Sequence, residues 1–534
     1  MPNAFPALTS RWFRFMLLLQ LGNALGVWSQ VVAGQWVLVE GGSSALVVSL
    51  VPAAVSLPFV LLAVPMGSVV SHRRREHLMA TAMTASALAS GGVAVLLRLD
   101  GGGPVVLVAS TAVVGVALVV IGISWQTMLP ETVERTHISS ATVLDGAIFN
   151  AARALGPVLA GVGLVAVGPQ WVFTLNAALF GGAAVAVLVS GRRWPSQVGT
   201  REPLWRSMRS GLWFVRHSPW TRRILFRMAA FGIPAASLWA LLPVVVHDRL
   251  QLTSVGLGVA TGMLGLGAVV GTVVIAPLRD RLTVNVFVAG GSAVYGIALL
   301  VLASSTWPPL VIAAMVPAGM AWVGVQSTWM MLANQALPGW IRPRVIALML
   351  CVFQGTQAIG AIAWGVLADW ISPSGSLAVA AGCLALTVLG FRRRGLPPVD
   401  GLTPDPANRA GPALVDIEGP VQVEHSYVVA KENREAFVAA ARDLRMSRLR
   451  LGAQAWVLLN DPASPELYVE RFRLAVAADL AAHGGERLTV PEDRVRRRLE
   501  DLAEVVSAAQ VLSVVDVGTN PRTTAARPWT TRTP

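Results

Sequence analysis

The chain has 534 residues, of which 54% are hydrophobic and 13% charged, and its mean hydropathy is +0.61. Soluble domains carry roughly 25% charged residues, so this chain has too few charges to cover a water-facing surface, and the composition predicts a membrane protein. The net charge of +13 comes mostly from short arginine runs between apolar stretches. No basic face with interleaved aromatic side chains accompanies them, so nucleic acid is not an expected partner.

Apolar stretches long enough to cross a bilayer recur through the first 391 residues. A helix needs about 20 residues to span the hydrocarbon core. Twelve stretches meet this length, at 13–39, 45–70, 78–98, 104–129, 142–167, 170–190, 223–247, 254–278, 284–304, 308–337, 344–370 and 374–391. The longest interruption, 191–222, divides them into two groups of six, which predicts an all-α membrane protein built from two six-helix halves.

The arginines between these stretches indicate how the chain is oriented. One set of alternate loops is rich in arginine, with Arg73, Arg74, Arg75, Arg135, nine arginines from Arg192 to Arg227, Arg279, Arg281, Arg342, Arg344 and Arg392 to Arg394. The other set holds only Arg98 and Arg249. Because loops rich in Lys and Arg stay on the cytoplasmic side, we expect a multi-pass protein of the inner (plasma) membrane with both termini in the cytoplasm.

The composition changes after Arg394, where a Pro/Gly-rich segment begins. Beyond it, strand-like segments such as "VQVEHSYVVA" alternate with helix-like ones in the order βαββ(α)αβ, which fits an α+β domain. The sequence therefore predicts an N-terminal half, a cytoplasmic central loop, a C-terminal half, a linker, a cytoplasmic α+β domain and a disordered tail, at 1–191, 192–222, 223–394, 395–413, 414–516 and 517–534.

A short internal repeat links the fifth and eleventh spans. "FNAARALGPVLAG" (149–161) matches "FQGTQAIGAIAWG" (353–365), so the polar pair Asn150 and Arg153 aligns with Gln354 and Gln357. Residues three apart share a face of a helix, and a polar face within a span must look toward protein or water. Arg153 falls near the middle of its span, where an unpaired cation is costly.

Motifs across nearly the whole chain resemble the major facilitator superfamily, in its branch of transmembrane secretion effectors, which is related to the enterobactin exporter and to drug–proton antiporters. The resemblance lies in "RWFRFMLLLQLGNALGVWSQVVAGQWVLVE", "LPETVERTHISSATVLDGAIFNAARALGPVLAG", "WVFTLNAALF" and "NQALPGWIRPRVIAL". It implies the major facilitator fold and transport by alternating access. The C-terminal segment is similar to a ferredoxin-like α+β domain that resembles antibiotic-biosynthesis monooxygenases.

The resemblance also assigns gating residues. The superfamily pattern G-x-x-x-D-R-x-G-R-R appears as "GSVVSHRRRE", with Gly67 and the basic run kept but Ser71 in place of the aspartate, so switching is expected to be tuned differently. The antiporter pattern of the fifth helix is present in part. The expected gating residues are Gly67, Arg73, Arg74, Arg75, Gly156, Pro157 and Gly161.

Polar and aromatic side chains within the spans supply candidates for a substrate site. Arg153 is the central one, either contacting a substrate or an acidic partner such as Asp145, or acting only in packing. Cavities for lipophilic compounds combine apolar faces with a few polar groups, which adds Asn150, Gln354, Gln357, Gln30, Trp36, Gln126, Trp239, Gln326 and Trp329. Some of the tryptophans are expected to be interface anchors instead.

Proton coupling needs a titratable group that reaches both sides in turn. The candidates are Asp145, Glu40 and Asp248, each of which is also explained as a solvated carboxylate near a span end. No carboxylate lies deep in a predicted span, so coupling to protons is implied by the resemblance alone.

The sequence favours proton-coupled efflux of a small amphipathic metabolite, drug or siderophore. Cys351 and Cys383 lie inside apolar runs, and no cofactor or metal site is expected. The alternative is a membrane-anchored sensor or monooxygenase-like enzyme acting through the C-terminal domain, where Tyr427, Trp456 and His483 would line a pocket. Residues 414–516 are also a candidate dimerisation region.

Overall fold

The computed structural model describes residues 6–72, 74–190, 204–337, 341–393, 395, 420–474, 489–506 and 510–513. They fall into two compact units, one dominated by long helices and one that contains the β-strands. The two units are described separately below.

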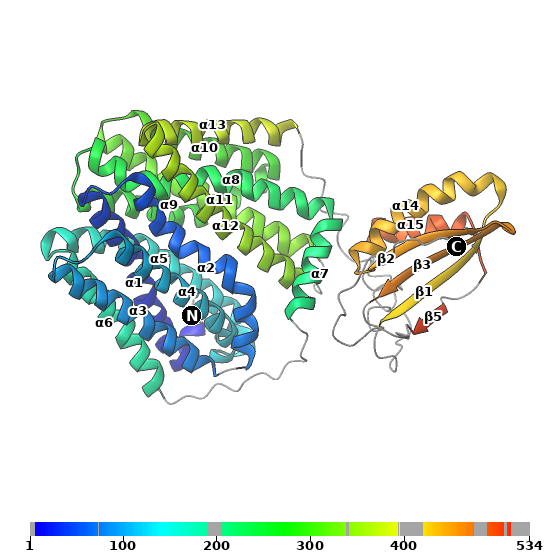
Figure 1. The fold of residues 1–534 in the computed structure, drawn as a ribbon, viewed down its shortest axis with the longest axis horizontal. Helices are drawn as coiled ribbons and strands as arrows, with labels where there is room; N and C mark the ends of the chain where they lie inside the picture. The colour runs from blue at the N-terminus through cyan, green and yellow to red at the C-terminus, as the bar shows by residue number, and fades with distance from the viewer. Residues whose placement is uncertain are drawn as a thin grey trace. The chain divides into compact units, whose positions relative to one another are not determined.

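Twelve of the described helices are long and apolar enough to cross a membrane, which confirms the predicted fold class. The first six are α1 (Arg11–Glu40), α2 (Ala45–His72), α3 (Arg75–Arg98), α4 (Pro104–Thr132), α5 (Ile138–Ala166) and α6 (Pro169–Val189). The second six are α8 (Pro219–Val244), α9 (Ser254–Arg281), α10 (Val284–Ser304), α11 (Pro308–Ala336), α12 (Arg342–Trp370) and α13 (Pro373–Arg393). Figure 1 shows the first set in blue to cyan and the second in green to yellow-green.

Local sequence explains where several of these helices begin. Five of them start with proline, whose fixed φ angle suits the first helical position and whose missing N–H would have no partner there. At the start of α1 the Ser10 hydroxyl accepts a hydrogen bond from the Phe13 N–H and donates one to the Thr132 carbonyl oxygen. The N-cap of α1 therefore also fastens it to the end of α4.

One helix was not expected from the sequence. The segment 192–222 was interpreted as a loop, yet Leu204–His217 forms the short helix α7. Its sequence, "LWRSMRSGLWFVRH", alternates arginines with large apolar residues at helical spacing. The run is too short to span a membrane, so its hydrophobic length does not identify it as a helix.

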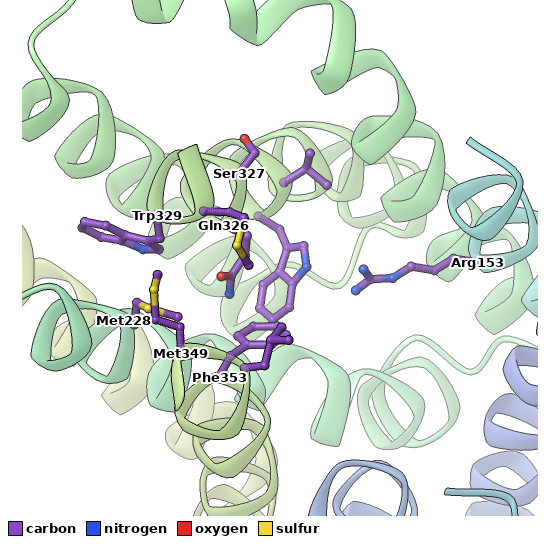
Figure 2. Close-up of a pocket in the computed structure, with 11 residues that line it drawn as sticks. Arg153, Met228, Gln326, Ser327, Trp329, Met349 and Phe353 are labelled. Atoms are coloured by element: carbon purple, nitrogen blue, oxygen red, sulfur yellow. The ribbon is translucent and has the colours of Figure 1, made fainter. Parts of the chain in front are cut away.

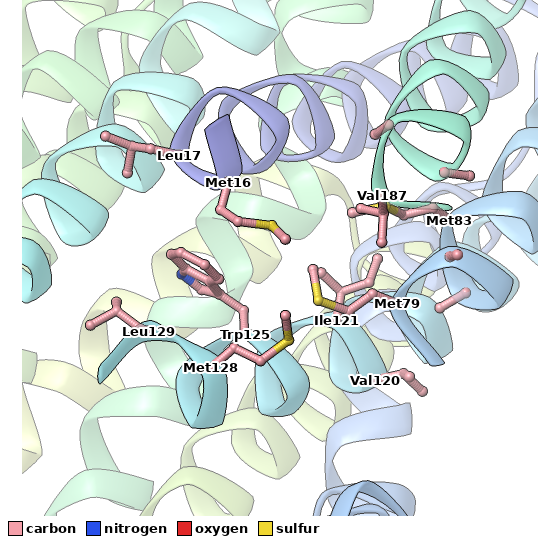
Figure 3. Packing of buried hydrophobic residues seen from close by; sticks show 14 of the residues in the cluster. Met16, Leu17, Met79, Met83, Val120, Ile121, Trp125, Met128, Leu129 and Val187 are labelled. Atoms are coloured by element: carbon pink, nitrogen blue, oxygen red, sulfur yellow. The ribbon is translucent and has the colours of Figure 1, made fainter. Parts of the chain in front are cut away.

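The first six helices share an apolar core at the end of the helical unit where α1 begins (Figure 3). Methionines from α1, α3 and α4 fill this core around Trp125, whose ring stacks on Phe13 with centroids 6.5 Å apart. Trp125 is 2% exposed. Its indole is consequently held in one place, with its N–H aimed at α5.

The second unit is an antiparallel sheet with helices on one face. Its elements are β1 (Val421–Val428), α14 (Arg434–Arg450), β2 (Ala455–Asp461), β3 (Ser464–Leu474), α15 (Val490–Asp501), β4 (Glu504–Val505) and β5 (Gln510–Ser513). The strand order is β2-β3-β1-β4, with β5 also pairing with β1. Apolar side chains of α14 and α15, such as Phe437 and Leu499, pack on Tyr427 and Tyr468 of the sheet. A sheet is therefore present in the region where the sequence predicts an α+β domain.

Candidate functional site

A cavity of about 250 Å³ lies among α5, α8, α11 and α12. Figure 2 shows Arg153 reaching toward it from α5, opposite labelled side chains of the second half. The described residues that line the cavity are Arg153, Met228, Trp322, Val323, Gln326, Ser327, Trp329, Met330, Met349, Leu350 and Phe353. Within this set Arg153 is the one charged residue, and the walls are otherwise mostly aromatic rings, thioethers and aliphatic groups.

The Arg153 guanidinium lies over three indole rings. Its Cζ atom is 5.1 Å from the ring centre of Trp28, 4.6 Å from that of Trp239 and 5.7 Å from that of Trp322. Trp28 belongs to α1, whereas Trp239 and Trp322 belong to α8 and α11. Ring faces attract cations within about 6 Å, so the charge of an arginine from the first half is held by tryptophans from both halves.

The other predicted substrate residues divide into two groups. Gln326 and Trp329 line the cavity, and Trp239 contacts Arg153. Asn150, Gln354 and Gln357 are not among the described lining residues. Asn150 Nδ2 donates to the Gly146 carbonyl one turn earlier in α5, at 2.9 Å, and Gln357 Nε2 donates to the Gly232 carbonyl of α8, at 3.3 Å. The repeated polar pair therefore contributes one cavity residue, Arg153.

Gln30, another predicted substrate residue, is not among the described residues that line this cavity. Its side chain is fully buried inside the first half, where it donates to Ser110 Oγ at 3.4 Å and accepts from Ser90 Oγ at 3.0 Å and Asn176 Nδ2 at 3.4 Å. A polar group within a span is satisfied by neighbouring helices as readily as by a cavity. Gln30 thus belongs to a polar cluster that joins α1, α3, α4 and α6.

Trp36 and Gln126 also contact other groups than the cavity. Trp36 is 5% exposed and its ring packs edge-on against the His247 ring, with centroids 5.5 Å apart. Gln126 is exposed, and its amide donates to Asp145 Oδ2 at 3.4 Å. Neither is among the described residues that line the cavity.

Asp145, one of the alternative partners considered for Arg153, is bonded to α4 instead. Its Oδ1 accepts a hydrogen bond from Trp125 Nε1 at 2.7 Å, in addition to the bond from Gln126. Asp145 precedes Arg153 by more than two helical turns on α5, a separation that the carboxylate does not bridge. The side chains around the Arg153 charge are instead the three indoles and the Tyr295 phenol.

The remaining carboxylate candidates lie at helix ends. Glu40 is the last residue of α1 and is exposed. The Asp248 side chain is 60% exposed and its Oδ1 lies 2.6 Å from His247 Nδ1. Both are placed as solvated loop carboxylates would be, at the end of the helical unit opposite the N-terminus.

At that same end, which we call the outer end, hydrogen bonds connect the two halves. Asp369, the penultimate residue of α12, accepts from the first two backbone N–H groups of α2, with Oδ1 2.8 Å from Ala45 N and Oδ2 3.3 Å from Leu46 N. Gln35 Nε2 donates to the Trp239 carbonyl at 3.0 Å. A carboxylate at a helix N-terminus is favoured by the helix dipole. The sequence analysis missed Asp369, because its role depends on which helix lies beside it.

Two glycines of α5 allow neighbouring helices to pack closely against it. A Cβ atom on Gly156 would lie 2.9 Å from Trp28 Cβ and 3.2 Å from the Leu25 carbonyl oxygen of α1. A Cβ on Gly161 would overlap the backbone carbonyl of Ser254 in α9. The side-chain hydroxyl of Ser254 also donates a hydrogen bond to the Gly161 carbonyl oxygen at 2.9 Å. Thus α5 packs on its own half at Gly156 and on the opposite half at Gly161. The carbonyl oxygen of Pro157 extends the second contact, at 2.7 Å from a Cβ placed on Gly258.

The same arrangement recurs in α12. A Cβ on Gly360 would lie 2.6 Å from the Ile233 carbonyl oxygen of α8, in the same half. A Cβ on Gly365 would overlap Ser49 Oγ and lie 2.9 Å from Leu46 Cα of α2, in the opposite half. The two repeated segments therefore form matching contacts between the halves, α5 with α9 and α12 with α2, toward the outer end.

The predicted gating residues between α2 and α3 are described only in part. Gly67 and Arg73 fall outside the residues whose side chains the structure describes. Arg74 is exposed, with Nη1 3.4 Å from His77 Nε2. Arg75 is 3% exposed and donates to Glu131 Oε1 at 2.8 Å and to the Thr127 carbonyl at 3.1 Å, which fastens α3 to α4. These contacts lie within the first half.

The second unit contains a buried ion pair beneath its helices. Glu470 accepts from Arg448 Nε at 3.1 Å, from Trp456 Nε1 at 2.8 Å and from the Tyr427 hydroxyl at 3.3 Å. Burial alone would raise the pKa of Glu470, but the charge and hydrogen bonds of Arg448 hold that pKa below its ordinary value. Burial, with a smaller contribution from the Arg448 charge, lowers the pKa of His425 to about 4.

Tyr427 and Trp456, which would line a pocket under the alternative enzyme function, are thus donors to a buried carboxylate. His483 lies outside the described residues. Among the residues that the structure describes, no three His, Cys, Asp or Glu side chains come together as metal ligands would.

Two six-helix halves that meet around a central cavity define a transporter fold. The chain belongs to the transmembrane secretion effector family of the major facilitator superfamily, whose family model matches residues 3–521. The multidrug efflux pump Tap of Mycobacterium tuberculosis is 25% identical to it over 370 residues, covering 66% of this chain and 86% of Tap.

Solved structures show the same fold at low sequence identity. The nucleoside transporter NupG is 12% identical, with a TM-score of 0.58 over 72% of this chain and 98% of NupG. A bacterial homologue of the iron transporter ferroportin is 17% identical, with a TM-score of 0.55 over 72% of this chain and 98% of that protein. The protein is a multi-pass membrane transporter of this superfamily.

Proposed function

We propose that the protein exports small amphipathic compounds across the plasma membrane in exchange for protons, by alternating access, with both termini in the cytoplasm. The observation that carries the proposal is the cavity at Arg153 together with the hydrogen-bonded outer end. The arginine-rich loops lie at the opposite end of the helical unit, which is the cytoplasmic end by the positive-inside rule.

The position of the cavity supports a conformation in which cargo enters from the cytoplasm. Met228, Met349 and Phe353 each lie in the first half of their helix, and Gln326 lies in the second half of α11, which runs the other way. The lining therefore extends from mid-depth toward the cytoplasmic end. The bonds from Asp369 and Gln35 join the halves on the other side of Arg153. Export requires these outer contacts to break while the cytoplasmic end closes.

The lining supports an amphipathic cargo. Apolar pockets with a small number of placed polar groups are typical of small-molecule sites, and this one combines Trp322, Trp329 and Phe353 with Gln326 and Arg153. The similarity to the efflux pump Tap supports a drug or a secreted metabolite, such as a siderophore, as cargo.

Carboxylates that change environment during the cycle are the proton-coupling groups of this proposal. Asp145 lies on α5 and is bonded to Trp125, and Asp369 holds the outer end closed. Protonating either carboxylate would weaken its hydrogen bonds to the neighbouring N–H groups, because a neutral carboxyl is the poorer acceptor. Glu40 and Asp248 remain candidates at the outer end.

Transport into inside-out membrane vesicles tests the proposal. A panel of fluorescent amphipathic compounds is added with an imposed pH gradient, acid inside, and then with the gradient collapsed by an ionophore. We expect uptake of at least one compound that falls to the level of empty vesicles when the gradient is collapsed. Uptake that is unaffected by the gradient would exclude proton exchange, and no uptake of any compound would contradict export.

We also propose that residues 414–516 form a ferredoxin-like module that regulates or dimerises the transporter. The support is the strand order β2-β3-β1 with β5 on the far edge, around two helices. Deleting 414–534 should leave gradient-driven uptake in place and change the detergent-solubilised particle from two copies of the chain to one. Loss of all uptake in a correctly inserted truncated protein would instead favour a function that resides in this domain.

A further inference from the structure

We propose that the Arg153 cavity selects planar organic compounds with a single negative charge, such as an aromatic carboxylate, and disfavours organic cations. The proposal rests on the export function above and specifies its substrate class. The anionic group would bind the Arg153 guanidinium, and the ring would lie among Trp322, Phe353 and the methionines of the cavity wall.

The first reason to expect an anionic ligand is the charge of the site. Of the described residues that line the cavity, Arg153 is the one ionised group, and no carboxylate is among them. Its ring contacts are the indoles of Trp28, Trp239 and Trp322, which attract the cation but carry no charge that cancels it. Tyr295 is also an electrostatic neighbour, but its uncharged hydroxyl donates to the Ala235 carbonyl at 3.0 Å. A monoanion entering the cavity would neutralise the site, whereas a cation would be repelled at short range in a medium less polar than water.

The donor geometry of arginine favours a carboxylate in particular. A guanidinium presents parallel N–H groups that match the two oxygens of a carboxylate, and such charge-assisted pairs are stronger than neutral hydrogen bonds. A guanidinium has five N–H donors, and Figure 2 shows the guanidinium of Arg153 reaching toward the cavity. An anion can therefore bind while part of the aromatic contact is kept.

The second reason concerns the ring of the ligand, because the size and lining of the cavity suit a flat aromatic group. Figure 2 shows Trp329, Met228, Met349 and Phe353 on the side of the cavity away from Arg153. Flat rings and polarisable thioethers pack well against an aromatic ligand. An apolar cavity of about 150 Å³ accepts benzene, so about 250 Å³ suits a molecule of roughly two fused rings with one polar group. Gln326 adds one uncharged polar side chain.

The arrangement also connects binding to the two halves. Arg153 belongs to the first half, and Trp239 and Trp322 belong to the second. An anion that draws the guanidinium toward the cavity loosens a contact between the halves, and a neutral compound of the same shape does not.

The test uses three probes that share one ring system, 2-naphthoate, 2-naphthamide and 2-naphthylmethylammonium, with the purified full-length protein in lipid nanodiscs. Binding is measured by calorimetry. We expect naphthoate to bind at least 10-fold more tightly than naphthamide and the cation to bind most weakly. In Arg153→Gln the acid and the amide should bind equally, and Arg153→Lys should keep part of the preference.

Arg98→Gln is the matched control. Arg98 also lies over a tryptophan, with Cζ 4.7 Å from the Trp171 ring centre, but it is exposed and is not among the described residues of the cavity. The preference for naphthoate should be unchanged in this variant. Should Arg153→Gln fail to fold, the comparison of the three probes on the unmodified protein and on Arg153→Lys still decides the matter.

Equal binding of the acid and the amide by the unmodified protein, or a preference that survives in Arg153→Gln, would overturn the proposal. The same probes, assayed for gradient-driven uptake in inside-out vesicles, separate it from the proposed function. Uptake of neutral or cationic compounds but not of anions would refute the anion preference and leave export standing. Selective binding of naphthoate without uptake of any compound would refute export and leave the anion site standing.

Discussion

Adding one methyl group at Gly365 should weaken the closure of the outer end. In Gly365→Ala the new Cβ would overlap Ser49 Oγ and lie 2.9 Å from Leu46 Cα. Carbon atoms prefer separations of about 3.5–4.0 Å, so α12 and α2 must part by roughly 0.6–1 Å at this contact. Both obstructing groups belong to the start of α2, including its backbone, so a change of side-chain rotamer cannot relieve the whole overlap.

Overpacking of this kind costs about 1–3 kcal/mol. In the proposed alternating-access cycle this contact separates when the outer end opens, so the cost falls on the closed state. The equilibrium should therefore shift toward outer-open conformations by about 5- to 150-fold. Gly360→Ala, which meets the Ile233 carbonyl of the same half, should lower stability without this shift.

Pulsed electron paramagnetic resonance measures the shift directly. Spin labels are placed at Leu99→Cys and Thr306→Cys, two exposed positions in outer loops of opposite halves, after Cys351 and Cys383 are replaced by serine. Gly365→Ala should gain a population with a longer distance between labels. Gly182→Ala is the control, because a Cβ there meets nothing within 4 Å. Identical distance distributions in the two variants would show that the contact between α12 and α2 does not control the outer end.

Three further outcomes follow from the described contacts. Asp369→Asn removes the charge at the start of α2, worth about 0.3–1 kcal/mol, so hydrogen exchange of the Ala45 and Leu46 amides should rise about 2- to 5-fold; unchanged exchange would mean that the carboxylate does not hold this end. Gln30→Leu should lower the free energy of unfolding by about 1–3 kcal/mol in thermal melts and leave naphthoate affinity unchanged, whereas a loss of affinity would return Gln30 to the cavity. The pKa of His425 falls from 6.5 to about 4 on folding, so the unfolded state binds the proton first as pH drops through this window. The second unit should accordingly lose about 3 kcal/mol between pH 6.5 and 4, and His425→Gln should reduce that loss when exchange of β1 amides is followed in the full chain; an unaltered pH profile would contradict the pKa assignment.

The twelve spans were predictable because hydrophobic length is a property of each segment by itself. Even the start of α12 at Arg342 lies within two residues of the predicted one. The helix α7 was missed for the same reason, since its apolar face is too short to register as a span. Hydrophobic length therefore identifies the membrane-spanning helices but not the short amphipathic helices between them.

The site was predictable only where a residue has one reasonable environment. A central arginine such as Arg153 has few alternatives to the interior, and the structure places it on a cavity wall. Gln30 and Gln326 are both glutamines within apolar spans, so the sequence does not distinguish them. The amide of Gln30 is nevertheless hydrogen-bonded to three side chains of neighbouring helices. The indoles around Arg153 come from three helices distant in the chain, and single-segment patterns do not select them from 18 tryptophans.

The paired glycines of α5 and α12 have a consequence for inhibition. Gly156 and Gly161, like Gly360 and Gly365, are five residues apart, which turns them about 140° from each other around the helix. One packs against its own half, and the other packs against the opposite half, at a seam that would open in the proposed cycle. A small apolar compound lodged in the opened seam at Gly161 or Gly365 would act as a wedge. It would halt turnover without competing with cargo, and its potency would be independent of what the cavity transports.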